Sequence, residues 1–512
     1  MICLGQKKMR QNLKLKIFFL IILFCGVFGV AGKTFGATRN VTCSGDITTA
    51  LTSATSLAID GDVVNISVGS CNVNPAWDNG VGWVDKNITL QGQGHGSCAG
   101  STCSCNPSVD TCLTTDDGLM NTSGIYSSET NSTKMAWRVT NIFLTSLNNG
   151  GGFSLSNDGY NYPVQPSGTS YGWRIDHMTF YYPNTCGPHA ITIRGLAFGL
   201  IDHNYFVMNC ESTIIYDGEF SSEDGSINNI FGAYNLAQPF QPGSLNAIYI
   251  EDNTFVASST GPYGASGYAA IDSGYRGGRI VFRHNTLTDV GLYSHWTTGG
   301  SVNTQWWEVY NNKFSWDYGG DWLTPMRIHG GGTGLIYDNT FVGWPENAIR
   351  IGEGRLPEQD QTGAPLLYCD GTHAWDGNAG DASAPGWPCL AQTGRAAGKT
   401  MAQILSGDKQ TTFPLYVWNN GLQDKCYDSS ALGLACDNSF GVVIYSGVNY
   451  FKSTPHVTAG FGNGDVDYSI TASQPSGAGN HTLTYTPLIY PHPLQDLIDV
   501  SHPEVPTGLA VN

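Results

Sequence analysis

The sequence predicts an all-β solenoid of the parallel β-helix type, and three observations predict it. A pattern of apolar, polar, polar, Asn, any residue and apolar recurs through the middle of the chain. The residues before each Asn alternate between apolar and polar, as residues of β-strands do. Glycine is abundant (65 residues) and aromatic residues make up 12%, while charged residues make up only 13%, a composition that suits a turn-rich β protein and argues against disorder.

The repeated pattern is complete four times between residues 250 and 341 and partial twice upstream, where Met178 replaces one Asn. The marker position recurs at 178, 204, 253, 285, 312 and 339, so its intervals are 26, 49, 32, 27 and 27 residues, and the longest fits two units. A period of this length indicates stacked repeats. The units are too short for a four-stranded propeller blade and lack both helical periodicity and the leucine-rich pattern. The remaining interpretation is that each unit is one coil of a parallel β-helix.

The recurring Asn has a structural explanation. Coils stack at ~4.8 Å, so equivalent residues of successive coils touch. An Asn at the turn tolerates unusual backbone angles, and its amide can bond to the Asn of the coils above and below as a ladder. Residues three and five before the marker, such as Ile250 and Ile248, are predicted to point inward, and those two and four before it outward.

The first element in the chain is a predicted capping helix at residues 47–58. Asp46 precedes it as the N-cap, and Ile47, Leu51 and Leu57 are predicted to face inward. Such a helix would cover the open end of the stack, which is otherwise an unpaired sheet edge.

The remaining signals divide the chain. Residues 148–169 and 352–425 are rich in glycine and other turn residues, and we expect them to form walls over the solenoid. The predicted parts are a signal peptide (1–37), a β-helix domain (38–351), an irregular insertion or lid (352–440), the last strands with a C-terminal cap (441–494) and a tail or linker (495–512).

The N-terminal segment predicts export. Residues 7–16 are basic, residues 17–30 are apolar, and small residues follow as far as Ala37. The apolar run is too short for a comfortable membrane span. With a cut soon after Ala31 or Ala37, the protein would be secreted to the extracellular space, the cell surface or the periplasm, with no membrane association.

The charge balance restricts the partners. The formal net charge is -17, and removal of the six basic residues of the leader leaves 18 basic and 41 acidic residues, a net of -23. Such a surface repels nucleic acid and anionic membranes. A polyanionic substrate would need a local arginine cluster or bridging cations.

The cysteines fit an oxidising compartment. Loss of Cys3 and Cys25 with the leader leaves twelve, for which disulfides are expected. The alternative for the cluster at residues 98–112 is a zinc site made of four thiols. The local pairs are Cys43 with Cys71, Cys186 with Cys210, Cys369 with Cys389, and Cys426 with Cys436, and the cluster is Cys98, Cys103, Cys105 and Cys112.

Several segments together resemble the secreted bacterial right-handed parallel β-helix repeat proteins of the pectate-lyase-like superfamily. They are residues 199–204, 249–255, 278–287, 331–341 and 485–494. The resemblance implies a single-stranded, right-handed coil and binding of a sugar polymer along one exterior sheet. It leaves the activity open, because that superfamily holds lyases, hydrolases, esterases and non-catalytic proteins. The paired-Asp signature of polygalacturonases and the Arg-rich signature of pectate lyases are missing from this sequence.

Alignment on the marker places two adjacent rows of polar residues on one sheet. The outward row, two before the marker, is Asp176, Asp202, Glu251, Arg283, Tyr310 and Tyr337. The turn row, just before the marker, is His177, His203, Asp252, His284, Asn311 and Asp338. The candidate catalytic residues are Asp202, His203, Glu251, Asp252, Arg283 and His284.

These residues support two chemistries and one structural explanation. Asp202 and Glu251, about two coils apart, would suit an acid and base pair in glycoside hydrolysis. In a lyase, Arg283 would take the proton while calcium stabilises the enolate. Alternatively, Glu251 and Arg283 pair across coils and the histidines cap turns, with small gains in stability.

Further candidates lie around this sheet. Substrate-binding residues are expected among Tyr310, Tyr337, His295, Trp296 and Arg327. The acidic loop with Asp217, Glu219, Glu223 and Asp224 could hold calcium, although its spacing also fits a solvated turn. No other cofactor is indicated.

Two functions remain. The first is a secreted polysaccharide-active enzyme, either a lyase or a glycoside hydrolase. The second is a non-catalytic extracellular β-helix that binds glycans or mediates adhesion.

Overall fold

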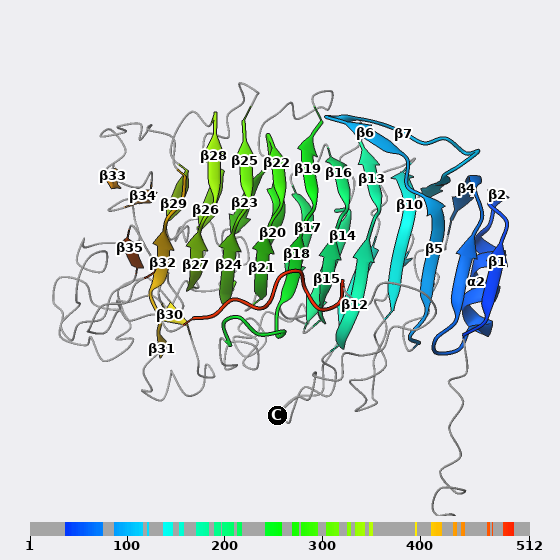
Figure 1. Cartoon of the computed structure of the whole chain (residues 1–512), viewed down its shortest axis with the longest axis horizontal. Coiled ribbons are helices and arrows are strands. Elements are labelled where there is room, and N and C mark those ends of the chain that lie inside the picture. Colours follow the sequence, from blue (N-terminus) through cyan, green and yellow to red (C-terminus); the bar gives the residue numbers. More distant parts are fainter. Residues whose placement is uncertain are drawn as a thin grey trace, which may run out of the picture.

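The computed structural model gives the fold as stacked β-strands with few helices (Figure 1). The residues that it describes are 36–74, 86–115, 120–121, 137–146, 153–157, 170–183, 189–195, 197–208, 212–217, 241–258, 269–275, 278–294, 304–316, 325–328, 333–343, 348–351, 395–396, 411–421, 434–437, 442–445, 468–471, 474 and 485–495.

Three long sheets, which we number 1 to 3, run along the stack, and nearly all their strand pairs are parallel. Sheet 1 carries the outward row. In spatial order its strands are β1 (Thr38–Val41), β3 (Val63–Ile66), β5 (Thr89–Gly94), β10 (Arg138–Ser146), β12 (Ser170–Asp176), β15 (Ala197–Asp202), β18 (Ile248–Glu251), β21 (Arg279–Arg283), β24 (Trp306–Tyr310), β27 (Thr333–Tyr337), β32 (Leu415–Trp418) and β35 (Tyr468–Thr471).

Sheet 2 follows sheet 1 around each coil. Its strands are β2 (Ser44–Asp46), β4 (Gly69–Val73), β8 (Thr111–Thr115), the second half of β10, β13 (Thr179–Tyr182), β16 (Tyr205–Met208), β19 (Thr254–Ala257), β22 (Thr286–Thr288), β25 (Lys313–Ser315) and β28 (Thr340–Val342).

Sheet 3 completes each coil. It contains β9 (Met120–Asn121), β11 (Phe153–Asn157), β14 (Ile191–Gly195), β17 (Ser212–Asp217), β20 (Ala269–Tyr275), β23 (Gly291–Ser294), β26 (Met326–Ile328), β29 (Ile349–Ile351), β34 (Val442–Tyr445) and β33 (Leu434–Asp437), the last pairing antiparallel. Two short antiparallel pairs lie outside these sheets: β6 (Ser97–Ala99) with β7 (Thr102–Ser104), and β30 (Arg395–Ala396) with β31 (Thr411–Thr412).

The coils follow the predicted alternation. Ile248 and Ile250 are fully buried in the central core, while Tyr249 and Glu251 point to the other face of the sheet. Equivalent aromatic side chains stack inside: the rings of Phe180, Phe206 and Phe255 follow one another at 4.7 Å between centroids. The all-β parallel stack predicted from the sequence is therefore confirmed.

The turn from sheet 1 into sheet 2 is the most regular part of each coil. The residue before the marker has a left-handed backbone in each case, with φ of 53° at His203 and 58° at Asp252. This conformation favours Asn, Asp and His over bulkier or branched residues. The same conformation occurs at His177, His284, Asn311, Asp338 and Asn419.

The predicted asparagine ladder is confirmed. The Asn253 amide donates to Asn285 Oδ1 at 3.1 Å, and the Asn312 amide donates to Asn339 Oδ1 at 2.9 Å. Each amide also donates to backbone carbonyl groups, so these buried side chains are well satisfied. The ladder continues to Asn420, which accepts from Asn339 at 3.0 Å and was not among the predicted markers.

The 49-residue interval is one coil, and its division into two units is wrong. Asn204 donates to Asn253 at 3.0 Å, and strand β15 pairs directly with β18. The extra residues form an insertion between β17 and β18. An insertion between two strands leaves their register unchanged, so the pairing of β15 with β18 does not depend on the length of the insertion. Asp202 and Glu251 are therefore register partners on adjacent strands, and are not two coils apart.

The capping helix is confirmed as α2 (Thr48–Leu57). Asp46 lies one residue before the N-cap, Ile47, and its Oδ1 accepts the Thr48 N–H at 2.9 Å. Leu51 is buried as predicted, but Leu57 is 63% exposed. Thr55 takes the inward place instead, because it follows Leu51 by four residues and its hydroxyl bonds to the Leu51 carbonyl at 3.0 Å.

Three disulfides lie within the described residues. Cys43–Cys71 is formed as predicted, and the cluster is paired as Cys98–Cys103 and Cys105–Cys112. The alternative of a zinc site is wrong, because no thiol of the cluster is left to bind metal. The predicted pairs 186–210, 369–389 and 426–436 each include at least one residue outside the described ranges.

The irregular insertion predicted at 352–440 does not lie wholly outside the stack. Strand β32 falls inside it and pairs in parallel with β27, so the chain has rejoined sheet 1 by Leu415. The wall predicted at 148–169 is also partly within the stack, because β11 falls inside it and pairs in parallel with β14 of sheet 3. Most of the remaining residues of these two segments and of the predicted leader lie outside the described residues. In the part of the chain that is described, no helix is long and apolar enough to span a membrane.

Asn312→Ala is expected to lower the free energy of unfolding by ~1–3 kcal/mol, because it leaves a buried ladder partner and backbone carbonyl groups unpaired. Urea denaturation measures the change. Lys313→Ala, at the adjacent exposed position, is the control and should change stability little. Equal effects of the two substitutions would contradict the structural role of the ladder.

Candidate functional site

The outward row of sheet 1 is buried beneath other chain segments. The side chains of Asp176, Asp202, Glu251 and Arg283 have no exposed surface, and Tyr310 is 3% exposed. Their register is as predicted, since Asp202 pairs with Glu251 and Glu251 with Arg283 across adjacent strands. The expectation of an open face along this row is wrong.

A C-terminal strap, residues 485–495, covers the row. It runs along the outer face of sheet 1, back over β27, β24, β21, β18 and β15 toward β12, and is drawn in red (Figure 1). From the sequence, residues 485–494 were predicted to belong to a cap at the end of the stack, and Gln495 to the tail. The strap instead lies lengthwise against the sheet.

Charged side chains of sheet 1 hold the strap. Arg283 donates to the Leu488 carbonyl at 2.8 Å and to the Ile489 carbonyl at 3.2 Å. Glu251 Oε1 accepts the His492 N–H at 2.8 Å and the Gln495 amide at 2.7 Å. An extended segment cannot satisfy its own backbone, so these side chains supply the partners that its buried polar groups need.

Glu251 and Arg283 also bond to each other. Arg283 Nε lies 2.5 Å from Glu251 Oε2, and both side chains are fully buried. Burial raises the pKa of Glu251 above its usual value although Arg283 acts in the opposite direction. The sequence offered an ion pair between Glu251 and Arg283 of neighbouring coils as the alternative to a catalytic role. The structure contains this pair, but both side chains are buried, whereas the alternative assumed an exposed pair.

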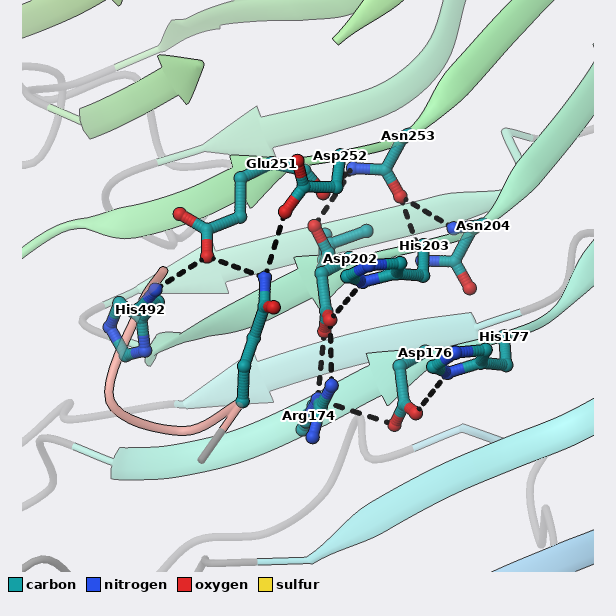
Figure 2. A network of polar contacts seen from close by, with 12 residues as sticks. Arg174, Asp176, His177, Asp202, His203, Asn204, Glu251, Asp252, Asn253 and His492 are labelled. Atoms are coloured by element: carbon teal, nitrogen blue, oxygen red, sulfur yellow. Dashed lines mark hydrogen bonds and ion pairs between the residues drawn. The ribbon is translucent and has the colours of Figure 1, made fainter. Parts of the chain in front are cut away.

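The turn row, in contrast, reaches the surface. Asp202 is buried and accepts two N–H groups of Arg174, at 2.8 and 2.7 Å. His203, the next residue, bonds through Nδ1 to Asp202 Oδ2 at 2.8 Å, and its side chain is 41% exposed (Figure 2). A carboxylate that accepts from an arginine is ionised, so the His203 ring donates from Nδ1 and directs Nε2 away from Asp202.

A second Asp–His pair lies one coil away. Asp176 accepts from Arg138 at 2.7 and 2.6 Å and from His177 Nδ1 at 2.7 Å. The His177 ring is 42% exposed and stacks on His203 with 5.0 Å between centroids and 5° between planes (Figure 2). Burial opposes ionisation of Asp176, but its bonds to Arg138 and His177 prevail and lower its pKa.

The next position of the turn row is Asp252. Its Oδ1 accepts the Tyr490 hydroxyl at 2.7 Å, and its Oδ2 accepts the Gln495 amide at 3.0 Å. The strap therefore orients both carboxylate oxygens of Asp252. Because Asp202 and Glu251 are register partners, His203 and Asp252 occupy equivalent turns of adjacent coils, about 4.8 Å apart along the stack.

Two histidines of the turn row have opposite pKa shifts. The hydrogen bond that His203 donates to Asp202 raises the pKa of His203, whereas burial lowers the pKa of His284. Within the strap, burial and then the charge of Arg283 lower the pKa of His492 to about 3. His492 therefore stays neutral, and its Nδ1 accepts the Leu494 N–H at 3.1 Å.

We expect an NMR titration to show His203 losing its proton at higher pH than His284. Because the folded-state pKa of His203 is raised, its contribution to stability is complete below the unfolded-state pKa and is lost as pH rises through the folded value. Asp202→Asn should bring the His203 midpoint down. Coincident midpoints of His203 and His284 in the unsubstituted protein would contradict the role assigned to Asp202.

The other predicted site residues are dispersed. Tyr310 and Tyr337 are buried rather than exposed, and they stack in a row with Trp418. Arg327 is half-buried in sheet 3. The side chain of Asp217 is not among those described, and His295, Trp296, Glu219, Glu223 and Asp224 also lie outside the described residues. Among the described residues, no group of three or more His, Cys, Asp or Glu is arranged to hold a metal ion.

Sequence reasoning missed the strap, and with it Tyr490 and Gln495. A signal was present. The outward positions four before the marker include Leu200, Tyr249, Val281 and Leu335, all apolar and all buried. Apolar residues on an outward face indicate that something covers the face.

No family model, no curated protein and no solved structure matches this chain significantly. The fold itself defines the class: an all-β protein whose long parallel sheets stack as a β-helix.

Proposed function

We propose that the chain is an exported, polysaccharide-active enzyme related to the pectate-lyase-like β-helices, and that it hydrolyses a neutral polysaccharide. The predicted leader and the formation of disulfides support export. The elongated turn row, with imidazoles and carboxylates on successive coils, suits a polymer that runs along the stack.

The observation that carries the proposal is the Asp202–His203 pair beside Asp252. Asp202 orients the ring of His203 and raises its pKa, which favours the protonated imidazole that a general acid needs. In the proposed reaction, His203 protonates the leaving glycosidic oxygen. Asp252, one coil away, attacks the anomeric carbon as the nucleophile. Water that the neutral His203 then deprotonates displaces the sugar from the carboxylate, so that both groups are restored and two shorter chains result.

Charge favours a neutral substrate. Elimination from a polyuronate requires cations that neutralise the substrate carboxylate. On this face, Arg138, Arg174 and Arg283 are committed to Asp176, Asp202 and Glu251, and the chain carries a net charge of -17. A lyase acting on an acidic polymer is therefore less well supported than a hydrolase.

The alternative, a non-catalytic glycan-binding β-helix, is favoured by one observation. Glu251 and Arg283, both predicted as catalytic, are buried under the strap and bonded to it. If the Asp–His pairs likewise serve only to build the turns, the turn row would bind a glycan without cleaving it.

Purified mature protein incubated with neutral and uronate polysaccharides tests the proposal. Release of reducing ends without unsaturated ends supports hydrolysis, and unsaturated ends would instead indicate a lyase. Binding of a polysaccharide without product would favour the non-catalytic alternative. Absence of both binding and product across the panel contradicts the proposal.

A further inference from the structure

The strap presents an aromatic ring beside the turn row. Tyr490 is 45% exposed and the preceding residue, Ile489, is 69% exposed. Within the described part of the chain, Tyr490 is the only aromatic residue among the large exposed hydrophobic side chains. Single exposed apolar side chains are common on protein surfaces, so the exposure of Tyr490 carries meaning only together with the polar groups beside it.

Three contacts fix the orientation of this ring. The Tyr490 hydroxyl donates to Asp252 Oδ1 at 2.7 Å, and the ring stacks on His284 with 3.7 Å between centroids and 20° between planes. The Arg283 guanidinium also lies over the ring, with its Cζ 5.4 Å from the centroid, and the part of the ring that these contacts leave uncovered is exposed. A ring held in this way loses little conformational entropy on binding a ligand.

The ring is also close to the proposed reacting groups. Tyr490 bonds to Asp252, which belongs to the coil next to His203. Gln495 places an amide on the other oxygen of Asp252. An aromatic face bordered by a carboxylate and an amide matches the chemistry of a sugar ring, which has apolar C–H faces and a rim of hydroxyl groups.

We propose that Tyr490 forms a sugar-binding subsite, in which the exposed part of its ring packs against the apolar face of one unit of the polysaccharide. The inference rests on the proposed function and adds to it, because it makes the strap a part of the substrate site. The competing explanation is that Tyr490 only fastens the strap, through its hydroxyl and its contact with His284.

Three variants separate these explanations. Tyr490→Phe keeps the ring and loses the bond to Asp252. Tyr490→Leu keeps apolar bulk over His284 and loses the aromatic face, and Tyr490→Ala loses both. Val342→Ala, which trims an exposed side chain on sheet 2, is the matched control.

Calorimetric titration with an oligosaccharide from the best-bound polysaccharide gives the readout, and thermal melting shows which variants remain folded. We expect Tyr490→Leu and Tyr490→Ala to weaken binding about tenfold, equivalent to ~1.4 kcal/mol, while Tyr490→Phe and Val342→Ala bind like the unsubstituted protein.

The possible failures are distinguishable. If the protein binds the oligosaccharide and folded Tyr490→Leu binds it equally well, the subsite is wrong and the proposed function stands. If Tyr490→Phe weakens binding as much as Tyr490→Ala, the hydroxyl and not the ring carries the effect, and the stacking inference is overturned. If no glycan binds the unsubstituted protein, both proposals fail.

Discussion

Arg283→Met is expected to lower the free energy of unfolding by about 3–5 kcal/mol, since it leaves the buried carboxylate of Glu251 without its cation. The substitution also removes the donors to the Leu488 and Ile489 carbonyls of the strap. Urea denaturation monitored by tryptophan fluorescence measures the loss. In the structural explanation drawn from the sequence, this pair contributed only a small gain in stability, because the pair was expected at the surface.

Two further variants control this experiment. Arg39→Met removes the partner of Asp62, but Asp62 retains the backbone N–H groups of Ala37 and Ile59, so a smaller loss is expected. Glu251→Gln combined with Arg283→Met should recover part of the stability, because no unpaired charge remains. A loss below ~0.5 kcal/mol for Arg283→Met would show that the pair is not buried as described.

His203→Asn is expected to reduce turnover by about 10²–10⁴-fold, the usual contribution of a general acid or base. Asparagine suits this position, because Asn311 and Asn419 adopt the same left-handed backbone on other coils. Stability should therefore change little while the proton donor is lost. The measurement is the rate of reducing-end release from the preferred polysaccharide at saturating concentration.

Asp338→Asn is the matched control for this variant. Asp338 occupies the turn row on a distant coil and is exposed, so its substitution should leave the rate unchanged. Turnover by His203→Asn at the unsubstituted rate would remove His203 from the mechanism. If the unsubstituted protein binds the polysaccharide but does not cleave it, the protein is a glycan-binding module instead.

The sequence predicted the parts of the fold that repeat. The marker asparagines specify the register, since each must lie over the next for the ladder to form, and apolar alternation specifies which side chains fill the core. Coil length was not predictable at the 49-residue interval, because an insertion outside the strands leaves no trace in the pairing. The inward place of Thr55 was missed because its hydroxyl is satisfied within its own helix.

The site was predicted in part, for a related reason. Local pattern places Asp202, His203 and Asp252 in adjacent rows, and the structure brings them to adjacent coils. The local pattern does not show what covers a row, because the covering residues are 148 to 320 positions away along the chain. The bond of Arg174 to the Leu494 carbonyl joins residues 320 apart.

The strap also imposes an order on assembly. Successive coils bond residues that are near neighbours along the chain, such as Asn285 and Asn312, which are 27 apart. The strap must find acceptors and donors on strands β12 to β27, so it can dock only after those strands are paired. Loop-closure entropy makes such distant contacts late events in folding. Until they form, Glu251 and Arg283 are hydrated, and the burial of this ion pair is complete only when residues 485–495 have docked.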